Sequence, residues 1–216
     1  MRNEAKTKIE RILSLVENLP FFSLDDLLTI EENKNYLKIL LSRCEKSGKV
    51  FRLKKGTYTT KEYFSSRITP EEINFYYEFL ANVLYSPSYL SLEYVLSEHN
   101  VLTEFSYNFT SITKNKTKKF KNRFGIFVYH HIKDPLFCGF NLIKKENFFI
   151  FKATKTKALF DFLYLRKDIL NKKNPLEELR LNLENFDKKD IKEFKTYLKL
   201  NSSKKMKEIF KNLLKL

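Results

Sequence analysis

Few side chains in this 216-residue chain could act as nucleophiles, acid–base groups or metal ligands. There are three histidines, His99, His130 and His131. If the adjacent pair lies in a strand, its two rings point to opposite faces and cannot share a metal ion without further ligands. Cys138 could act as a nucleophile near His131, but nothing orders a third group beside them. We therefore expect no metal site, no catalytic residue and no enzyme activity.

One carboxylate, Asp161, lies within a strongly apolar stretch, 158–165. Burying an unpaired charge is costly, so this residue needs a partner. Lys157 and Arg166 are both near in sequence, and a structural ion pair is favoured over an acid–base role. The four glycines are too widely separated for a Walker A loop or a dinucleotide-binding fingerprint. We therefore expect no cofactor.

The charge of the chain favours a polyanionic partner. Lys and Arg number 41 against 26 Asp and Glu, which gives a formal net charge of +15. Nucleic acid is the first candidate, although A/T-rich coding DNA could account for part of the lysine content. No apolar run reaches the ~18 residues of a transmembrane helix, and the N-terminus lacks a secretory apolar stretch. Cys44 and Cys138 cannot build a disulfide framework. We expect a cytoplasmic protein without membrane association.

The first 62 residues have the pattern of a winged helix-turn-helix domain. Apolar residues at helical spacing predict helices at 6–19, 24–30 and 33–47, with Ser23 as the N-cap of the second. Two β-prone runs around Lys54-Lys55-Gly56 predict a hairpin over 50–60. In this fold the last helix enters the major groove and the hairpin, or wing, contacts the flanking backbone.

The third helix and the wing supply the candidate DNA contacts. Asn and Arg can recognise adenine and guanine, whereas Lys mostly contacts phosphate. A solvated helix face in a lysine-rich protein is the alternative, and winged helices also serve as protein-interaction modules. The candidate residues are Asn33, Lys34, Asn35, Lys38, Ser42, Arg43, Lys46, Arg52, Lys54 and Lys55.

The rest of the chain predicts an α+β protein, in which a mixed α/β domain with a helical C-terminal part follows the winged helix. Residues 63–86 are expected to form a linker and a connecting helix, and 87–216 the second domain. Within this part, 61–69 is polar and predicts a linker, and Pro70 at the first helical position predicts a helix to about Tyr85. Alternation predicts strands at 105–112, 124–130 and 147–152, and helical spacing predicts helices at 92–99, 158–165, 176–183, 188–199 and 203–216.

A basic run follows the first of these strands. As a loop, it would project six positive charges over about 10 residues and could follow a phosphate backbone. A solvated turn is the alternative. The six residues are Lys114, Lys116, Lys118, Lys119, Lys121 and Arg123.

Several segments resemble the AbiEi antitoxin family of type IV toxin–antitoxin systems, which act in abortive infection. The first match comprises Tyr89-Leu90-Ser91-Leu92-Glu93-Tyr94-Val95-Leu96, Thr110-Ser111-Ile112-Thr113, Phe127-Val128-Tyr129-His130-His131-Ile132-Lys133 and Phe137-Cys138-Gly139-Phe140. The second is 153–165, where the family typically has A-x-P-E-K-A-L-x-D-L-L-Y-L. This chain has Lys155 in place of the usual Pro and Thr156 in place of Glu.

This resemblance implies an N-terminal DNA-binding domain and a C-terminal antitoxin domain. It implies autorepression through inverted repeats of double-stranded DNA in the promoter. It also implies a nucleotidyltransferase-like toxin that is counteracted without a stable complex. Three alternatives stay open: a winged-helix protein that neutralises its partner by direct contact, a stand-alone transcriptional regulator, and a nuclease.

Overall fold

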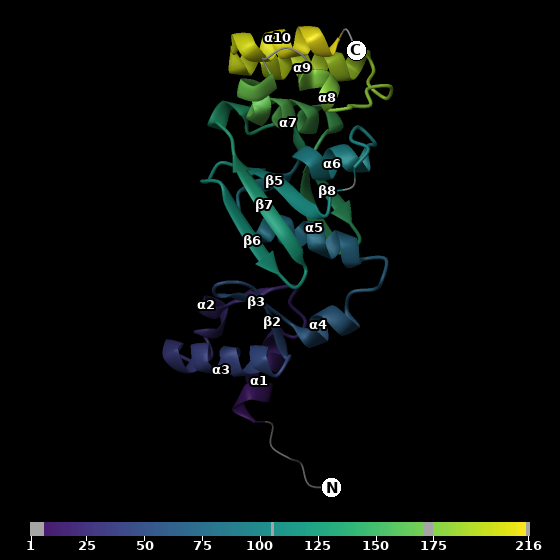
Figure 1. Ribbon diagram of the computed structural model, residues 1–216. Coiled ribbons are helices and arrows are strands. Elements are labelled where there is room, and N and C mark those ends of the chain that lie inside the picture. Colours follow the sequence, from purple (N-terminus) through teal and green to yellow (C-terminus); the bar gives the residue numbers. More distant parts are fainter. Residues whose placement is uncertain (1–6, 105, 171–174, 215–216) are drawn as a thin grey trace. The chain divides into compact units, whose positions relative to one another are not determined.

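The computed structural model describes residues 7–104, 106–170 and 175–214 of the chain (Figure 1). It is a mixed α+β structure with a helical C-terminal part, as predicted. The chain divides into two compact units. Unit 1 comprises residues 1–76 together with 122–124, and unit 2 comprises 77–121 together with 125–216.

Unit 1 contains a small antiparallel sheet with the strand order β1-β3-β2. Its helices enclose a core that includes Phe22, Leu27, Leu37, Leu41 and Val50, all of them fully buried. The predicted three helices and hairpin are present, although the first two helices are shorter than expected. The elements are α1 (Lys8–Val16), β1 (Phe22–Ser23), α2 (Leu24–Leu27), α3 (Lys34–Lys46), β2 (Val50–Lys54), β3 (Thr57–Thr60) and α4 (Lys61–Ser66).

Side-chain caps set where the helices of unit 1 begin. Thr7 and Ser23 form capping boxes with Glu10 and Asp26, which confirms Ser23 as the N-cap of α2. Asn33 caps α3, so this helix begins one residue later than predicted. Each cap satisfies backbone N–H groups that have no partner within the helix.

The predicted linker at 61–69 is wrong, because α4 occupies Lys61–Ser66. The Thr60 hydroxyl caps this helix by accepting the N–H of Tyr63, and Tyr63 and Ile68 are both buried. The polar composition concealed these two apolar anchors. The following helix, α5 (Ile73–Leu84), begins after Pro70 rather than at it, since a turn closed by the Thr69 N–H and the Glu72 carboxylate precedes it.

Unit 2 is built on a six-stranded sheet with the order β6-β7-β5-β4-β9-β8. The pairs β5–β7 and β4–β9 are parallel, whereas β4–β5 and β8–β9 are antiparallel. Three strands were predicted, β5, β7 and β9, and three were missed. The strands are β4 (Ser88–Leu90), β5 (Asn108–Thr113), β6 (Lys118–Asn122), β7 (Gly125–His131), β8 (Phe140–Lys145) and β9 (Phe148–Ala153).

Helices cover both faces of this sheet. On one face, Phe79 of α5 packs on Phe148 and the Tyr129 hydroxyl donates to the Ala81 carbonyl. On the other face, Asp161 accepts a hydrogen bond from Tyr89 of β4. The remaining helical elements of unit 2 are α6 (Leu92–Glu98), a short 3-10 helix (Asp134–Leu136), α7 (Lys155–Leu170), α8 (Pro175–Glu178), α9 (Lys188–Asn201) and α10 (Lys204–Leu213).

The C-terminal helices α7, α9 and α10 stack on one another (Figure 1). Phe160 of α7 packs edge-on against Phe194 of α9, which in turn stacks on Phe210 of α10. The prediction of α9 and α10 is confirmed, with α10 ending at Leu213. The predicted helix at 176–183 is wrong beyond Glu178, where the chain turns and Arg180 adopts a left-handed conformation. Phe105 and Asn174, at which the sequence predicts a strand and a helix break, lie outside the described residues.

Candidate nucleic-acid interface

The outer face of α3 is an exposed stripe of polar and basic side chains. Asn35, Lys38, Ser42 and Lys46 lie at helical spacing, and all four are exposed. Ile39, in the middle of the stripe, has 55% of its surface exposed although it is a large apolar residue. The opposite face of the helix, made of Leu37, Leu40, Leu41 and Cys44, is buried in the core of unit 1.

Arg43 extends this stripe, and Ile39 is the residue that sequence reasoning missed. The Arg43 guanidinium is exposed and lies one turn after Ile39. An isoleucine at this place can contact the methyl group of thymine, as other apolar side chains do in the major groove. Its spacing along α3 places it on the polar face, but an apolar side chain is not by itself a sequence signal for DNA contact.

Two predicted residues at the start of α3 have structural partners. The Asn33 Oδ1 accepts the N–H groups of Asn35 and Tyr36 at 3.1 and 3.0 Å, so this oxygen is already engaged as a cap. Lys34 lies 3.2 Å from Asp25 of α2, and both side chains are exposed. An exposed pair of this kind contributes little to stability and can exchange Asp25 for a phosphate.

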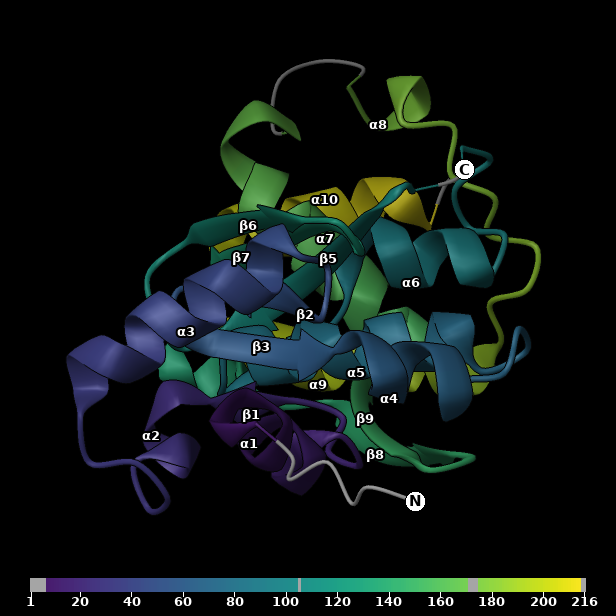
Figure 2. The same ribbon diagram turned by 90° about the horizontal axis from the view of Figure 1, so that it is seen from below.

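The predicted wing is the hairpin formed by β2 and β3. Arg52 and Lys55 are exposed and Lys54 is half-buried. Gly56 adopts a positive φ of 79°, which a glycine accepts without steric cost. The Gly56 carbonyl accepts the N–H of Leu24 at 3.0 Å, so the turn is held against the start of α2. In Figure 2 the hairpin runs beside α3.

The basic run at 114–123 is not the predicted loop, because Lys118–Asn122 forms β6, an edge strand of the sheet. Phe120 anchors this strand by packing against Tyr85 and Tyr129. Lysines on an edge strand also discourage pairing with other chains, which gives a structural reason for part of the run.

The six cations of the run differ in their surroundings. Lys116, Lys119 and Lys121 are exposed. Lys114 lies 4.0 Å from Asp134 and also over the ring of Phe137. Lys118 lies over the rings of Tyr85 and Phe120, and the Arg123 guanidinium stacks 3.6 Å above Phe51. By the division into units, Arg123 belongs to unit 1 and the five lysines belong to unit 2.

The groups considered for catalysis are bonded to different backbone carbonyls and not to each other. The His131 Nδ1 faces the carbonyls of Lys114 and Asn115, whereas the Cys138 thiol donates to the Pro135 carbonyl at 3.9 Å. Burial raises the pKa of the Cys138 thiol, which disfavours the reactive thiolate. Among the residues that the structure describes, no three His, Cys, Asp or Glu side chains are arranged to hold a metal ion.

Asp161 has the predicted ion-pair partner. Its carboxylate pairs with Lys157 within α7 and accepts the hydroxyls of Ser91 and Tyr89 at 2.9 and 3.0 Å. Arg166, the other candidate, bonds to Glu93 instead. The first ion pair therefore lies within α7, and the second joins α7 to α6.

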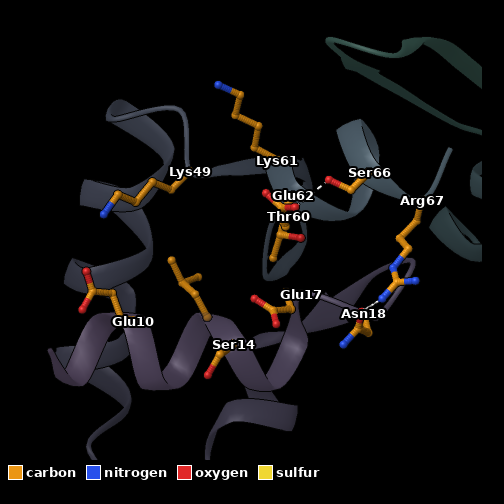
Figure 3. Close-up of a pocket in the computed structure, with 11 residues that line it drawn as sticks. Glu10, Ser14, Glu17, Asn18, Lys49, Thr60, Lys61, Glu62, Ser66 and Arg67 are labelled. Atoms are coloured by element: carbon orange, nitrogen blue, oxygen red, sulfur yellow. Dashed lines mark hydrogen bonds between the residues drawn. The ribbon is translucent and has the colours of Figure 1, made fainter. Parts of the chain in front are cut away.

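A cavity of about 680 Å³ lies between α1 and α4 in unit 1 (Figure 3). The Arg67 guanidinium donates to Asn18 at 2.7 Å at one end of it. Its charged lining is of mixed sign, so the cavity does not favour an anionic ligand. The basic stripe of α3 does favour one. The charged residues are Glu10, Glu17, Glu62, Lys49, Lys61 and Arg67.

No helix within the described part of the chain is both long and apolar enough to cross a membrane. Comparisons with protein-family models and with curated protein sequences find no match.

Proposed function

We propose that unit 1 binds double-stranded DNA, with α3 in the major groove and the β2–β3 hairpin on the neighbouring phosphates. The observation that carries this proposal is the exposed stripe of α3, in which Asn35, Ile39 and Arg43 can address bases while Lys38 and Lys46 address phosphates. These side chains project from a helix whose other face is locked in the core. A rigid helix holds such contacts in one register.

The order of elements supports this proposal. Helix, short strand, two helices and a hairpin, with a three-stranded antiparallel sheet, is the order of a winged helix-turn-helix. The hydrogen bond between Leu24 and Gly56 fixes the hairpin relative to α2. In this proposal α2 and α3 serve as the two helices of the helix-turn-helix. A wing that is fixed in this way can contact the backbone at a defined distance from α3.

We further propose that the protein is a repressor of its own operon and the antitoxin of a nucleotidyltransferase-like toxin. The resemblance to AbiEi antitoxins is the basis for this step. The contacts of Asp161 support it, because Tyr89 and Ser91 come from the first resembling segment and Asp161 from the second. The resembling segments thus contribute to one buried cluster in unit 2. Neutralisation of a partner by direct contact and a stand-alone regulator are the alternatives.

A gel-shift titration on the DNA upstream of the gene tests DNA binding. Inverted repeats should be bound, and affinity should fall steeply between about 50 and 200 mM salt. Arg43→Ala should weaken binding to the repeat more than to random DNA, whereas Lys55→Ala should weaken both equally. Lys61→Ala, which removes an exposed lysine of α4, is the matched control. Binding that is absent or independent of salt would refute the proposal.

Co-expression with the product of a neighbouring nucleotidyltransferase-like gene tests the antitoxin step. The toxin gene is placed under an unrelated inducible promoter, so that repression of the operon cannot account for rescue. Both the wild type and Arg43→Ala should restore growth, because the proposed antitoxin segments lie in unit 2. Growth that stays arrested with the wild type would refute this step. A stable complex on co-purification would instead support neutralisation by direct contact.

A further inference from the structure

The two C-terminal helices form a groove that the DNA-binding proposal does not use. Its volume is about 840 Å³, and it lies between α9 and α10. The helices are joined at Ser202, which has a left-handed conformation, and Ser203 caps the second helix. We call this the lysine groove, and it is bordered by Lys195, Lys199, Lys204, Lys207 and Lys211.

The charge of the lysine groove is strongly one-sided. Glu208 is the acidic residue among its described lining residues. The five lysines make no ion pair with any residue in the described part of the chain, whereas the adjacent Lys205 pairs with Asp168 at 2.7 Å. The paired Lys205 thus lies outside the groove lining, and the five lysines that border the groove have no carboxylate partner among the described residues. Such an arrangement attracts an anionic partner.

The floor of the lysine groove is apolar. Leu198 and Phe210 form it, and each retains 7% of its surface exposed. The Phe210 ring stacks on Phe194 with centroids 4.7 Å apart, so its face is occupied within the protein. Single-stranded nucleic acids bind by stacking bases on free aromatic faces, which this floor does not offer. A combination of apolar floor and cationic border fits a ligand with one apolar side and one acidic side.

We propose that the lysine groove binds an acidic amphipathic helix of a partner protein. Apolar residues of that helix at i, i+3, i+4 and i+7 would lie on Leu198 and Phe210, as in other helix-in-groove complexes. Its carboxylates would pair with lysines on both borders, Lys195 and Lys199 on α9 and Lys207 and Lys211 on α10. The charges speed association and select the partner, and the apolar contact supplies affinity. This proposal does not depend on DNA binding by unit 1.

Fluorescence anisotropy with the full chain tests the proposal. The probe is a labelled peptide of about 18 residues, roughly five helical turns, with leucines along one face and glutamates along the other. A peptide of the same composition in scrambled order keeps the charge but loses the apolar face. The amphipathic peptide should bind at least about 5-fold more tightly than the scrambled one at physiological salt.

Charge reversal separates the groove from the general charge of the chain. Lys199→Glu with Lys207→Glu should weaken binding of the amphipathic peptide about 10-fold. The control is Lys189→Glu with Lys192→Glu, which makes the same charge change at exposed positions of α9 outside the groove lining. This control variant should weaken binding less than about 2-fold. All four side chains are exposed, and circular dichroism will verify that both variants are folded.

Three results would overturn the proposal. The first is equal loss of affinity in the groove and control variants, which would indicate non-specific attraction. The second is equal affinity for the amphipathic and scrambled peptides. The third is a single-stranded oligonucleotide, or vesicles containing anionic lipid, that bind more tightly than the amphipathic peptide and lose that binding only in the groove variant.

Discussion

Lys157 and Asp161 form an ion pair one turn apart on α7, and both side chains are completely buried. Burial raises the pKa of the Asp161 carboxyl, while the Lys157 ammonium and the hydroxyls of Ser91 and Tyr89 oppose that rise. The Lys157 ammonium also lies over the rings of Phe160 and Tyr197, at 5.1 and 5.2 Å from their centroids. Every polar contact of this pair is therefore made inside unit 2.

Removing one member of this pair should be much more costly than removing both. Lys157→Met leaves the Asp161 carboxylate buried without its cation, and we expect a loss of about 3–5 kcal/mol in the free energy of unfolding. The double variant Lys157→Met with Asp161→Leu should recover most of this loss, because no charge is left unpaired. Urea denaturation followed by circular dichroism measures all three proteins.

The exposed pair Lys205–Asp168 is the matched control for this comparison. Lys205→Met should change stability by less than about 1 kcal/mol, since water replaces the lost partner. If Lys157→Met were equally mild, the buried pair would not be a determinant of stability. In that case the contacts of Asp161 with Ser91 and Tyr89 would suffice to hold α7 in place.

Gly139 provides a second test of the same region. A Cβ at this position would lie 2.2 Å from the Tyr197 hydroxyl oxygen and 3.0 Å from the Lys157 Cδ, and the backbone has a φ of +74°. We expect Gly139→Ala to destabilise the protein by more than about 2 kcal/mol, because steric overlap adds to the strain of a left-handed alanine. The midpoint of thermal unfolding should fall accordingly.

Gly48→Ala separates these two contributions. Gly48 has a similar φ of +71°, but nothing lies within 4 Å of the position that a Cβ would take. Only the conformational cost applies there, about 1 kcal/mol. Equal losses at the two positions would show that Tyr197 moves away without cost, and that Gly139 is needed only for its backbone conformation.

His130 should make stability depend on pH. Burial and the nearby Arg166 lower the pKa of this imidazole, whereas Glu93 opposes the change. Below about pH 6.5 the unfolded chain therefore takes up a proton that the folded chain does not, so the free energy of unfolding falls as the solution is acidified. Stability at pH 8 is free of this effect, because the imidazole is neutral in both states.

His130→Gln tests this assignment through the slope of stability against pH. Between pH 6.5 and the lowered pKa of His130, the free energy of unfolding of the variant should fall less than that of the wild type. This difference in slope is expected whatever the stability of the variant at pH 8. Denaturant midpoints measured at several pH values give this slope. A slope identical to that of the wild type would assign the acid sensitivity to other groups, of which His99, with its pKa also lowered by burial, is the first candidate.

Local sequence signals predicted the first three helices and the hairpin of unit 1, but missed α4 and three strands of unit 2. Ser23 and Gly56 have strong local preferences, for a helix cap and for a turn, and both are found in those roles. By contrast, β6 contains four polar residues and only Phe120 as an apolar anchor. Its strand conformation comes from pairing with β7 and from the contacts of Phe120 with Tyr85 and Tyr129, which no local window contains.

The candidate sites show the same difference. The ion pair of Asp161 was predictable because Lys157 is four residues away and therefore on the same helix face. Its hydroxyl partners, Ser91 and Tyr89, are about 70 residues distant in the chain and could be found only from the fold. The lysine groove likewise requires the packing of α9 on α10, because separate lysine-rich helices resemble solvated surfaces.

Ile39 should contribute to DNA recognition but not to the stability of unit 1. It is 55% exposed on the outer face of α3, so Ile39→Ala removes little buried surface and should shift the free energy of unfolding by less than about 0.5 kcal/mol. If its side chain contacts a thymine methyl, the variant should lose about 1 kcal/mol of affinity for the operator and almost none for random DNA. Anisotropy titrations on both DNAs measure the difference.

Leu37→Ala, on the buried face of the same helix, should instead destabilise the fold by about 2–5 kcal/mol. Equal loss of affinity for both DNAs on Ile39→Ala would place this residue outside the base contacts, and would leave Asn35 and Arg43 as the residues that select the sequence.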